Sequence, residues 1–238
     1  MLLPLSKVVV KCEICDSLAT TQVELTYNNP SPDHPYECTY TFPLDKTTVL
    51  AKFEAVIDER VVHTKVVEKE AANEQYEDAV AAGNSAVLAE RSTKKDETMT
   101  VKLGNLMPGQ SATLKSTIIS QLEVVGGHYA FLLPAAFYPD YRKHGVKDRA
   151  SFVYEFSYEV RILSQSRITN LSLPSNFIIA AQNDSRTDLL VRGSQVGRTI
   201  DLYYRTVDML IPALHYATVP DSEQVAVAVS LVPTFDPV

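Results

Sequence analysis

The sequence lacks the features that mark membrane proteins and nucleic-acid-binding proteins. None of its 238 residues lie in an apolar run close to the ~20 residues that a membrane-spanning helix needs. Lys and Arg total 22 against 29 Asp and Glu, so the net charge at pH 7 is −7. Because nucleic acids and anionic membrane surfaces are bound through an excess of Lys and Arg, neither is expected as the main partner.

The N-terminus lacks a secretory signal. Residues 1–7, MLLPLSK, contain no basic segment followed by an apolar run of secretory length, and Pro4 interrupts the few apolar residues present. The composition, 45% hydrophobic and 21% charged, is ordinary for a soluble globular chain that buries a core. We therefore expect a soluble, cytoplasmic protein.

Cysteine is scarce, and the three present are an odd number, which does not indicate a disulfide framework. Cys12 and Cys15 form a C-x-x-C, a spacing also found in metal-binding knuckles and redox pairs. They lie in an alternating segment typical of a strand, where residues three apart point to opposite faces. We expect Cys12 and Cys38 to be small buried core residues, and we expect no metal site.

Recognisable catalytic patterns are also missing. No two of the five histidines have the i, i+3 or i, i+4 spacing that places two imidazoles on one metal. The sequence contains no G-x-S-x-G elbow, no phosphate-binding glycine loop and no dinucleotide fingerprint. We expect no catalytic residue and no cofactor, and therefore a protein that is not an enzyme.

Short segments that alternate apolar and polar residues dominate what is present. They favour β-branched and aromatic residues, and turn residues separate them, which is typical of strands. The predicted strands are 7–15, 21–27, 36–42, 49–57, 60–67, 98–103, 111–125, 129–133, 152–163, 167–173, 177–182, 189–192, 199–204 and 224–232. Their spacing predicts a mainly β protein, an antiparallel β-sandwich with one amphipathic α-helix packed on the sheet.

Three dipeptides predict tight turns between these strands. Asp58-Glu59 has the length of a two-residue hairpin loop, and Gly126-Gly127 predicts a second tight hairpin. Pro108-Gly109 suits the two central positions of a type II turn, because the second of them needs a positive φ.

The stretch from Glu68 to Glu90 is the exception to the strand pattern. Its small or apolar residues recur at helical spacing, at Ala72, Tyr76, Ala79, Val80 and Gly83. A glycine just past a helix end supplies the left-handed cap, so we expect the helix to end at Ala81 or Ala82. Tyr76 should then be buried against the sheet.

The opposite face of this predicted helix is acidic. It carries Glu70, Glu74, Glu77 and Asp78. Catalytic carboxylates need a pocket that moves one pKa away from the other, whereas these side chains should face water. We take the four acidic residues as a possible interaction surface.

These segments, in this order, resemble the VIT (vault protein inter-alpha-trypsin) domain. The matching pieces are Asp16-Ser17-Leu18-Ala19, Tyr27 to Pro30, Thr41-Phe42-Pro43-Leu44, Phe53-Glu54-Ala55 with Ile57-Asp58, Tyr76 to Gly83 with Leu88 and Glu90, Val101 with Gly104-Asn105-Leu106, Pro108-Gly109, and Tyr129 through Pro134 to near Tyr141. One departure is Glu59, where the family commonly has Gly. Each piece alone is weak, but together they are specific.

The resemblance implies a division of the chain and a role for it. Residues 1–141 would be the VIT domain, and residues 142–238 a β-rich continuation leading towards a von Willebrand factor A (VWA) domain. The VWA metal motif D-x-S-x-S is absent, and residues 231–238 look like the lead-in to the first VWA strand. We therefore expect a fragment lacking the VWA domain.

The function implied by the resemblance is a non-enzymatic interaction or scaffolding module of an intracellular VIT–VWA protein. Its partner would be a protein, an adjacent VWA domain of the same chain. The alternative is an extracellular, matrix-associated module similar to the inter-alpha-trypsin inhibitor heavy chains. The oligomeric state is left open by the sequence.

Overall fold

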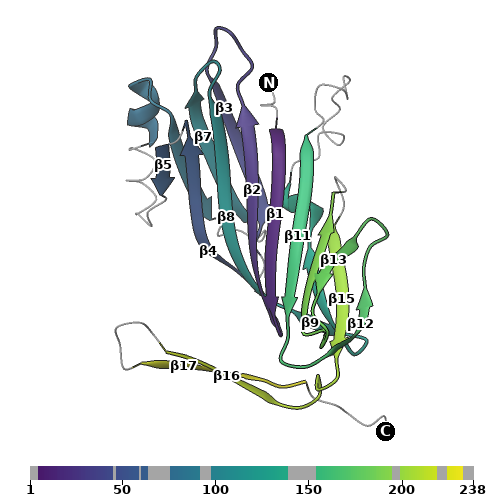
Figure 1. The fold of residues 1–238 in the computed structure, drawn as a ribbon. Coiled ribbons are helices and arrows are strands. Elements are labelled where there is room, and N and C mark those ends of the chain that lie inside the picture. Colours follow the sequence, from purple (N-terminus) through teal and green to yellow (C-terminus); the bar gives the residue numbers. More distant parts are fainter. Residues whose placement is uncertain are drawn as a thin grey trace.

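The computed structural model describes residues 5–44, 47–58, 60–63, 76–91, 98–138, 154–194, 199–218 and 224–232. In this part of the chain, strands form four sheets, one short helix covers residues 76–81, and a 3-10 turn, η1, covers Ala135–Phe137 (Figure 1). The expectation of a mainly β protein with one helix is confirmed for these residues.

The largest sheet has eight strands in the order β13-β14-β11-β1-β2-β8-β4-β5. Their bounds are β1 (Leu5–Cys15), β2 (Leu18–Asn28), β4 (Thr48–Ile57), β5 (Arg60–His63), β8 (Ser111–Gln121), β11 (Glu155–Leu163), β13 (Ile178–Gln182) and β14 (Asp188–Gly193). Along β1 the predicted alternation is present, since Val8, Val10, Cys12 and Ile14 are buried and Lys11 is exposed. One face of this sheet therefore lies on the core.

The pairing of β1 with β11 corrects the expected fold. These strands run parallel, with Val8 opposite Phe156 and Ile14 opposite Ile162, so the expectation of a wholly antiparallel sheet is wrong at this ladder. Alternating apolar residues specify which face of a strand is buried, but they do not specify the direction of its neighbour. The parallel ladder brings residues after position 150 into the same sheet as the N-terminal strands.

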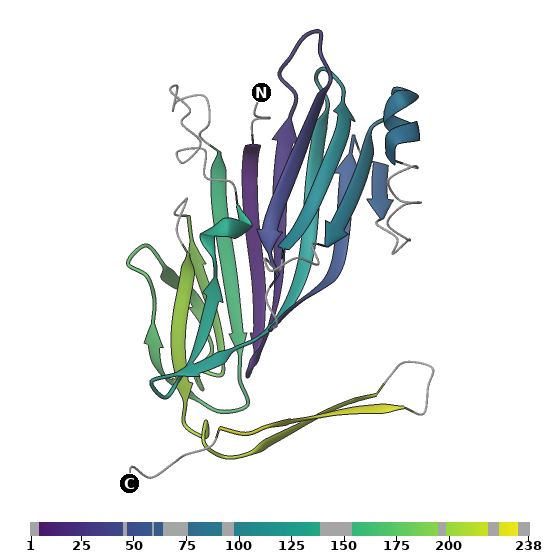
Figure 2. The same cartoon turned by 180° about the vertical axis from the view of Figure 1, so that it is seen from behind.

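Two smaller sheets lie over the same face of the large sheet, β3, β7 and β6 at one end and β15 and β10 at the other (Figure 2). The first has the order β3-β7-β6, with β3 (Tyr36–Pro43), β6 (Ala86–Arg91) and β7 (Thr98–Leu106). The second has the order β12-β15-β10-β9, with β9 (Glu123–Val125), β10 (His128–Leu133), β12 (Ile168–Ser172) and β15 (Ile200–Thr206). Buried residues of all three sheets form one hydrophobic core.

The predicted strand 111–125 is divided in two. It leaves the large sheet at Gln121, and β9 joins another sheet. Between them Leu122 is buried, and its main-chain N–H donates to the carbonyl oxygen of Ser17 at 2.8 Å. The chain thus crosses between the layers at Leu122, a change that the continuous apolar alternation does not reveal.

The helix ends as predicted, with Ala81 its last residue. Gly83 has φ of +80°, its N–H donates to the carbonyl of Val80, and the N–H of Asn84 donates to the carbonyl of Ala79, which is the Schellman arrangement. Residues 64–75, including Ala72 and the predicted helix start, lie outside the described residues. Tyr76 is half-buried rather than fully buried.

The described helix turn packs over Gly104 of β7. A Cβ at Gly104 would lie 2.6 Å from the Tyr76 hydroxyl oxygen and 2.7 Å from Val80 Cγ2, so glycine makes this close approach possible. Next to it, Asn105 has φ of +51°, and its side-chain amide donates to the carbonyl of Val80 at 2.7 Å. Gly104 and Asn105 therefore dock the end of the helix on the sheet.

The predicted tight turns are confirmed. The Gln110 N–H donates to the carbonyl of Met107, and Gly109 has φ of +75°, as a type II turn requires. The two-residue loop of Gly126 and Gly127 connects β9 to β10, both glycines having positive φ. Ile57 pairs with Arg60, which gives the expected two-residue hairpin loop.

Candidate protein-interaction surface

The fourth sheet is a two-stranded ribbon of β16 (Ala213–Thr218) and β17 (Val225–Ser230), and it pairs with none of the other described strands. Figures 1 and 2 show it extending away from the layered body, at the end opposite the helix. The strands are antiparallel, with Leu214 opposite Val229 and Tyr216 opposite Val227. We call β16 and β17 together the ribbon.

One face of the ribbon is formed by large apolar side chains. Because side chains alternate along a strand, the residues at every second position of both strands share this face. They are Leu214, Tyr216, Val225, Val227 and Val229, with exposed fractions of 62%, 75%, 55%, 60% and 67%. The other face is formed largely by small residues, among them Ala213, Ala217, Ala226 and Ala228.

This exposure is unusual for a strand pair. A lone two-stranded hairpin is marginally stable in water, because it has no sheet or helix to bury its apolar face. Soluble proteins rarely leave a contiguous apolar patch uncovered unless it is a binding site. Burying one side chain of Val or Leu size contributes about 1.5–3 kcal/mol of favourable free energy. Binding of a partner that covered the ribbon's apolar face would therefore be favoured by several such contributions.

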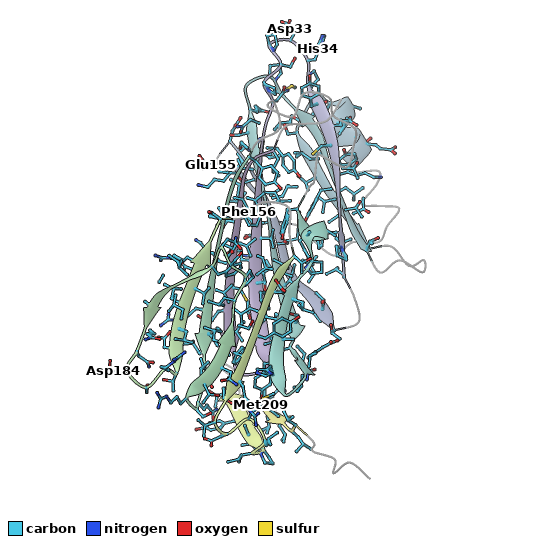
Figure 3. The ribbon with its side chains drawn as sticks, turned by 90° about the vertical axis from the view of Figure 1, so that its right-hand side faces the viewer. Asp33, His34, Glu155, Phe156, Asp184 and Met209 are labelled. Carbon is cyan, nitrogen blue, oxygen red and sulfur yellow. The ribbon has the colours of Figure 1, made fainter. Side chains whose placement is uncertain are left out.

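The root of the ribbon is held firmly on the body. Met209, just before β16, is buried, and Figure 3 shows it at the base of the ribbon. The Val207 N–H donates to the Arg167 carbonyl at 3.0 Å. Where β17 ends at the body, the Ser230 side chain is hydrogen-bonded to that of Tyr129, and Val232, two residues further along the chain, packs on the core. The direction in which the ribbon extends is therefore set by the body.

The acidic residues predicted as an interaction surface do not lie on the ribbon. Glu77 and Asp78 are exposed on the short helix, at the other end of the molecule. Glu70 and Glu74 lie outside the described residues. An interaction role for this acidic set stays a prediction.

Sequence reasoning found only half of the ribbon. It predicted a strand over 224–232 but none over 213–218. The alternation of Leu214, Tyr216 and Thr218 just after Pro212 was an available signal, but the intervening alanines are poor strand formers and obscure it.

One residue that carries the family resemblance, Asn29, joins distant parts of the fold. Asn29 is buried, and its side-chain amide donates to the carbonyls of Leu106 at 2.7 Å and His34 at 2.9 Å. Its side-chain oxygen accepts from the Ser31 N–H at 2.8 Å. With three partners for one buried amide, Asn29 ties the end of β2 to the loop between β7 and β8.

The strongest pKa shifts belong to buried core groups. Burial raises the pKa of Cys12 to about 12 and that of Cys38 to about 12. Burial also raises the pKa of Tyr40, whose hydroxyl donates to the Phe137 carbonyl at 2.6 Å. Cys12 is buried and Cys15 exposed, so the two thiols diverge as expected. The expectation of a buried core residue is confirmed for Cys12 but only partly met for Cys38, which is half-buried. Among the described residues, no three of His, Cys, Asp and Glu gather as metal ligands.

Comparison with known proteins gives a family for the first half of the chain. The family model of the vault protein inter-alpha-trypsin (VIT) domain matches residues 5–118. Human protein mono-ADP-ribosyltransferase PARP4 is 36% identical over 138 residues, which are 58% of this chain and 8% of that protein. Rat von Willebrand factor A domain-containing protein 5A is 26% identical over 223 residues, 86% of this chain and 27% of the relative. The chain thus spans less than a third of these relatives.

Solved structures resemble the fold only distantly. An M1 zinc metallopeptidase from Deinococcus radiodurans gives a TM-score of 0.43 at 11% identity, covering 95% of this chain and 46% of that one. No helix among the described residues is long and apolar enough to cross a membrane. The family match therefore rests on the sequence. Residues 5–118 match the VIT domain family, as the resemblance in the sequence predicted.

Proposed function

We propose that this chain is a non-enzymatic protein-interaction module and that the ribbon is its binding surface. The observation that carries the proposal is the apolar face of β16 and β17, exposed along its length but fixed to the body at its root. A partner that packs on this face would remove five large side chains from water. It could also pair with an open edge of the ribbon, as extended segments do when they add to a sheet.

The proposed partner is a VWA domain of the same protein. Support comes from the relatives, since the match to rat von Willebrand factor A domain-containing protein 5A extends over 86% of this chain. Within one polypeptide a second domain is held at high effective concentration, so even a modest apolar contact forms. The chain would then act as a scaffold that sets the position of its neighbour.

We also propose an intracellular location. All three cysteines are free, and Cys15 is exposed, which fits a reducing compartment better than an oxidising one. The alternative, a secreted matrix-associated module, predicts a glycan at Asn170, which is exposed and begins the sequon Asn170-Leu171-Ser172. Mass spectrometry of the protein from its own cells separates the two, because a glycosylated Asn170 contradicts the intracellular proposal.

Site-specific crosslinking tests the binding surface. A photo-reactive amino acid replaces Tyr216, the most exposed large side chain of the ribbon, in the full-length protein that contains this chain. We expect the crosslinked peptides to come from a VWA domain. The matched control places the same group at Val61 of β5, which is also exposed but lies away from the ribbon.

Charge variants give the second test. Leu214→Lys and Val227→Lys lie on the same apolar face and leave position 216 free for the photo-reactive group, and each should abolish the crosslink to the neighbouring domain without lowering the melting temperature of the chain. Val61→Lys should change neither. Equal crosslinking from Tyr216 and Val61, or crosslinks only between two copies of this chain, would refute the proposal.

A further inference from the structure

A second candidate site lies between two sheet edges, away from the ribbon's apolar face. An open cavity of about 640 Å³ is lined by consecutive residues of β12 together with His128, Ile179 and Arg186. Strand β12 is the outer strand of its sheet, and β13, which contributes Ile179, is the outer strand of the large sheet. The cavity is therefore bordered by strand edges that no other described strand occupies.

Arg186 is the unusual residue of this cavity. Its Nε is buried and has no hydrogen-bond partner, and it is the one such side-chain nitrogen or oxygen in the part of the chain that the structure describes. The neighbouring arginines are paired, Arg161 with Asp188 at 2.7 Å and Arg192 with Glu159 at 2.8 Å. A buried guanidinium N–H without an acceptor is costly in a native protein. A ligand in the cavity that accepts from the other N–H groups of the same guanidinium would offset part of this cost.

The turn that carries Arg186 is rigid. The side-chain oxygen of Asn183 accepts from the N–H groups of Thr187 and Asp188, at 2.9 and 3.2 Å, and the Asn183 amide donates to the Thr187 hydroxyl at 2.9 Å. The Arg186 carbonyl accepts from the Ile168 N–H at 2.9 Å, which fixes the turn to the segment that enters β12.

The backbone of Arg186 is also strained. It has φ of +55°, in the left-handed region that residues other than glycine rarely adopt. Asp184, the acidic residue of the same turn, is exposed at its outer rim (Figure 3). The turn therefore fixes the backbone from which the Arg186 side chain extends, and strained backbone of this kind is found at binding sites.

The residues that line the cavity favour one kind of anionic ligand over another. A guanidinium binds a carboxylate or a phosphate through two parallel N–H donors. Among the described lining residues Arg186 is the only Lys or Arg, and the only aromatic ring is the imidazole of His128, so a nucleobase would have no large aromatic surface of Phe, Tyr or Trp to stack on. Leu171, Leu173 and Ile179 supply apolar contacts along the edge of β12. These features favour a single carboxylate on an extended apolar chain over a phosphate group or a nucleotide.

We infer that this cavity binds an extended peptide segment, which lies along the free edge of β12 and presents an acidic side chain to Arg186. Main-chain hydrogen bonds to the strand edge would supply affinity, and the carboxylate would supply selectivity. Asn170 and Ser172, which line the cavity from β12, offer further polar groups to the peptide.

A peptide titration tests this inference. The probe is the acetylated, amidated pentapeptide Thr-Val-Glu-Val-Thr, and the control is the same peptide with glutamine in place of glutamate. In the folded 238-residue chain, we expect the glutamate peptide to shift the Nε–Hε NMR signal of Arg186 and to bind at least about tenfold more tightly than the glutamine peptide. Inorganic phosphate at about tenfold excess should not displace it.

Variants complete the test. Arg186→Gln should weaken the glutamate peptide at least about tenfold, and Arg186→Lys, which keeps the charge but loses the two-donor geometry, should give an intermediate loss. The matched control Arg167→Gln, an exposed arginine in the segment before β12, should change affinity less than about twofold. Equal binding of both peptides, full affinity in both Arg186 variants, no binding of the glutamate peptide, or displacement by phosphate would each overturn the inference.

Discussion

The hydroxyl of Tyr204 donates a hydrogen bond to the main-chain carbonyl of Asp16, 188 residues earlier in the chain. Tyr204 is fully buried, and burial raises its pKa, so it acts as a neutral donor. Asp16 forms the turn between β1 and β2 with φ of +49°, and its N–H donates to the Leu163 carbonyl at 3.0 Å. This turn is therefore where the VIT segment and the later strands are joined.

Removing the Tyr204 hydroxyl should weaken this junction. Tyr204→Phe keeps the ring but leaves the Asp16 carbonyl without that donor, so the free energy of unfolding should fall by about 1–2 kcal/mol. Tyr203→Phe, on the opposite face of β15 and half-buried, should change it by less than about 0.5 kcal/mol. Urea denaturation measures both, and equal losses in the two variants would contradict the role given to Tyr204.

Docking of the helix on β7 depends on the absence of a side chain at Gly104. In Gly104→Ala the new Cβ would overlap Tyr76 and Val80, so the helix must shift, at a cost of about 1–3 kcal/mol. Adding Val80→Ala to this variant removes part of the overlap and should recover some of the loss. If the double variant is less stable than Gly104→Ala by the full cost of Val80→Ala alone, the two positions do not interact.

Local signals in the sequence predicted local structure well. The alternation of β1, the Gly83 cap and the Pro108-Gly109 turn each depend on residues within a few positions of one another, and each is found. The parallel pairing of β1 with β11 and the hydrogen bond from Tyr204 to Asp16 join distant residues, which no local pattern encodes. The Arg186 cavity likewise exists only because β12 and β13 end their sheets on the same side.

The Cys12 thiol should make stability depend on pH in the alkaline range. Burial raises its pKa in the folded protein from 9.0 to about 12. Above about pH 9 the unfolded chain releases this proton while the folded protein retains it, so the free energy of unfolding falls as the pH rises towards 12. Between about pH 8 and about pH 10.5, this group should lower it by about 2 kcal/mol.

Cys12→Ala isolates this effect. The variant is less stable at neutral pH because it leaves a small cavity, but it should lose about 2 kcal/mol less than the wild-type chain over the same pH interval. Other buried groups, such as Tyr40, contribute equally to both proteins and cancel in the comparison. Parallel pH profiles of the two proteins would show that Cys12 does not titrate in this way.

The ribbon should be the least protected β structure of the isolated chain. Its side chains are largely exposed and it pairs with no further described strand, so it can open without disturbing the core. Amide hydrogens of β16 and β17 should exchange with deuterium ~100-fold faster than those of β1 and β2. Mass spectrometry of the exchanged protein measures both rates. When the neighbouring domain is present, protection should rise in the ribbon. Equal protection of the ribbon and β1 would mean that the ribbon is stable without a partner.

Asn29 gives the sharpest test of the contacts that define the VIT segment. Its amide donates to the carbonyls of Leu106 and His34, so Asn29→Ala leaves two acceptors without this donor and should cost about 2–3 kcal/mol. Asn29→Asp should cost at least as much at neutral pH, because it places a carboxylate oxygen against two carbonyl oxygens in a buried site.

Acidification separates these two variants. A carboxyl group at position 29 has its pKa raised by burial and by the carbonyls that face it, and once protonated it can donate to one of them. The stability that protonation gives to Asn29→Asp is present below the ordinary carboxyl pKa of about 3.9 and is lost as the pH rises through the raised value. Asn29→Asp should therefore gain stability relative to Asn29→Ala between about pH 7 and about pH 4, measured by urea denaturation. If the two variants change in parallel over this range, the carbonyls of Leu106 and His34 do not face position 29, and the contacts described for Asn29 are wrong.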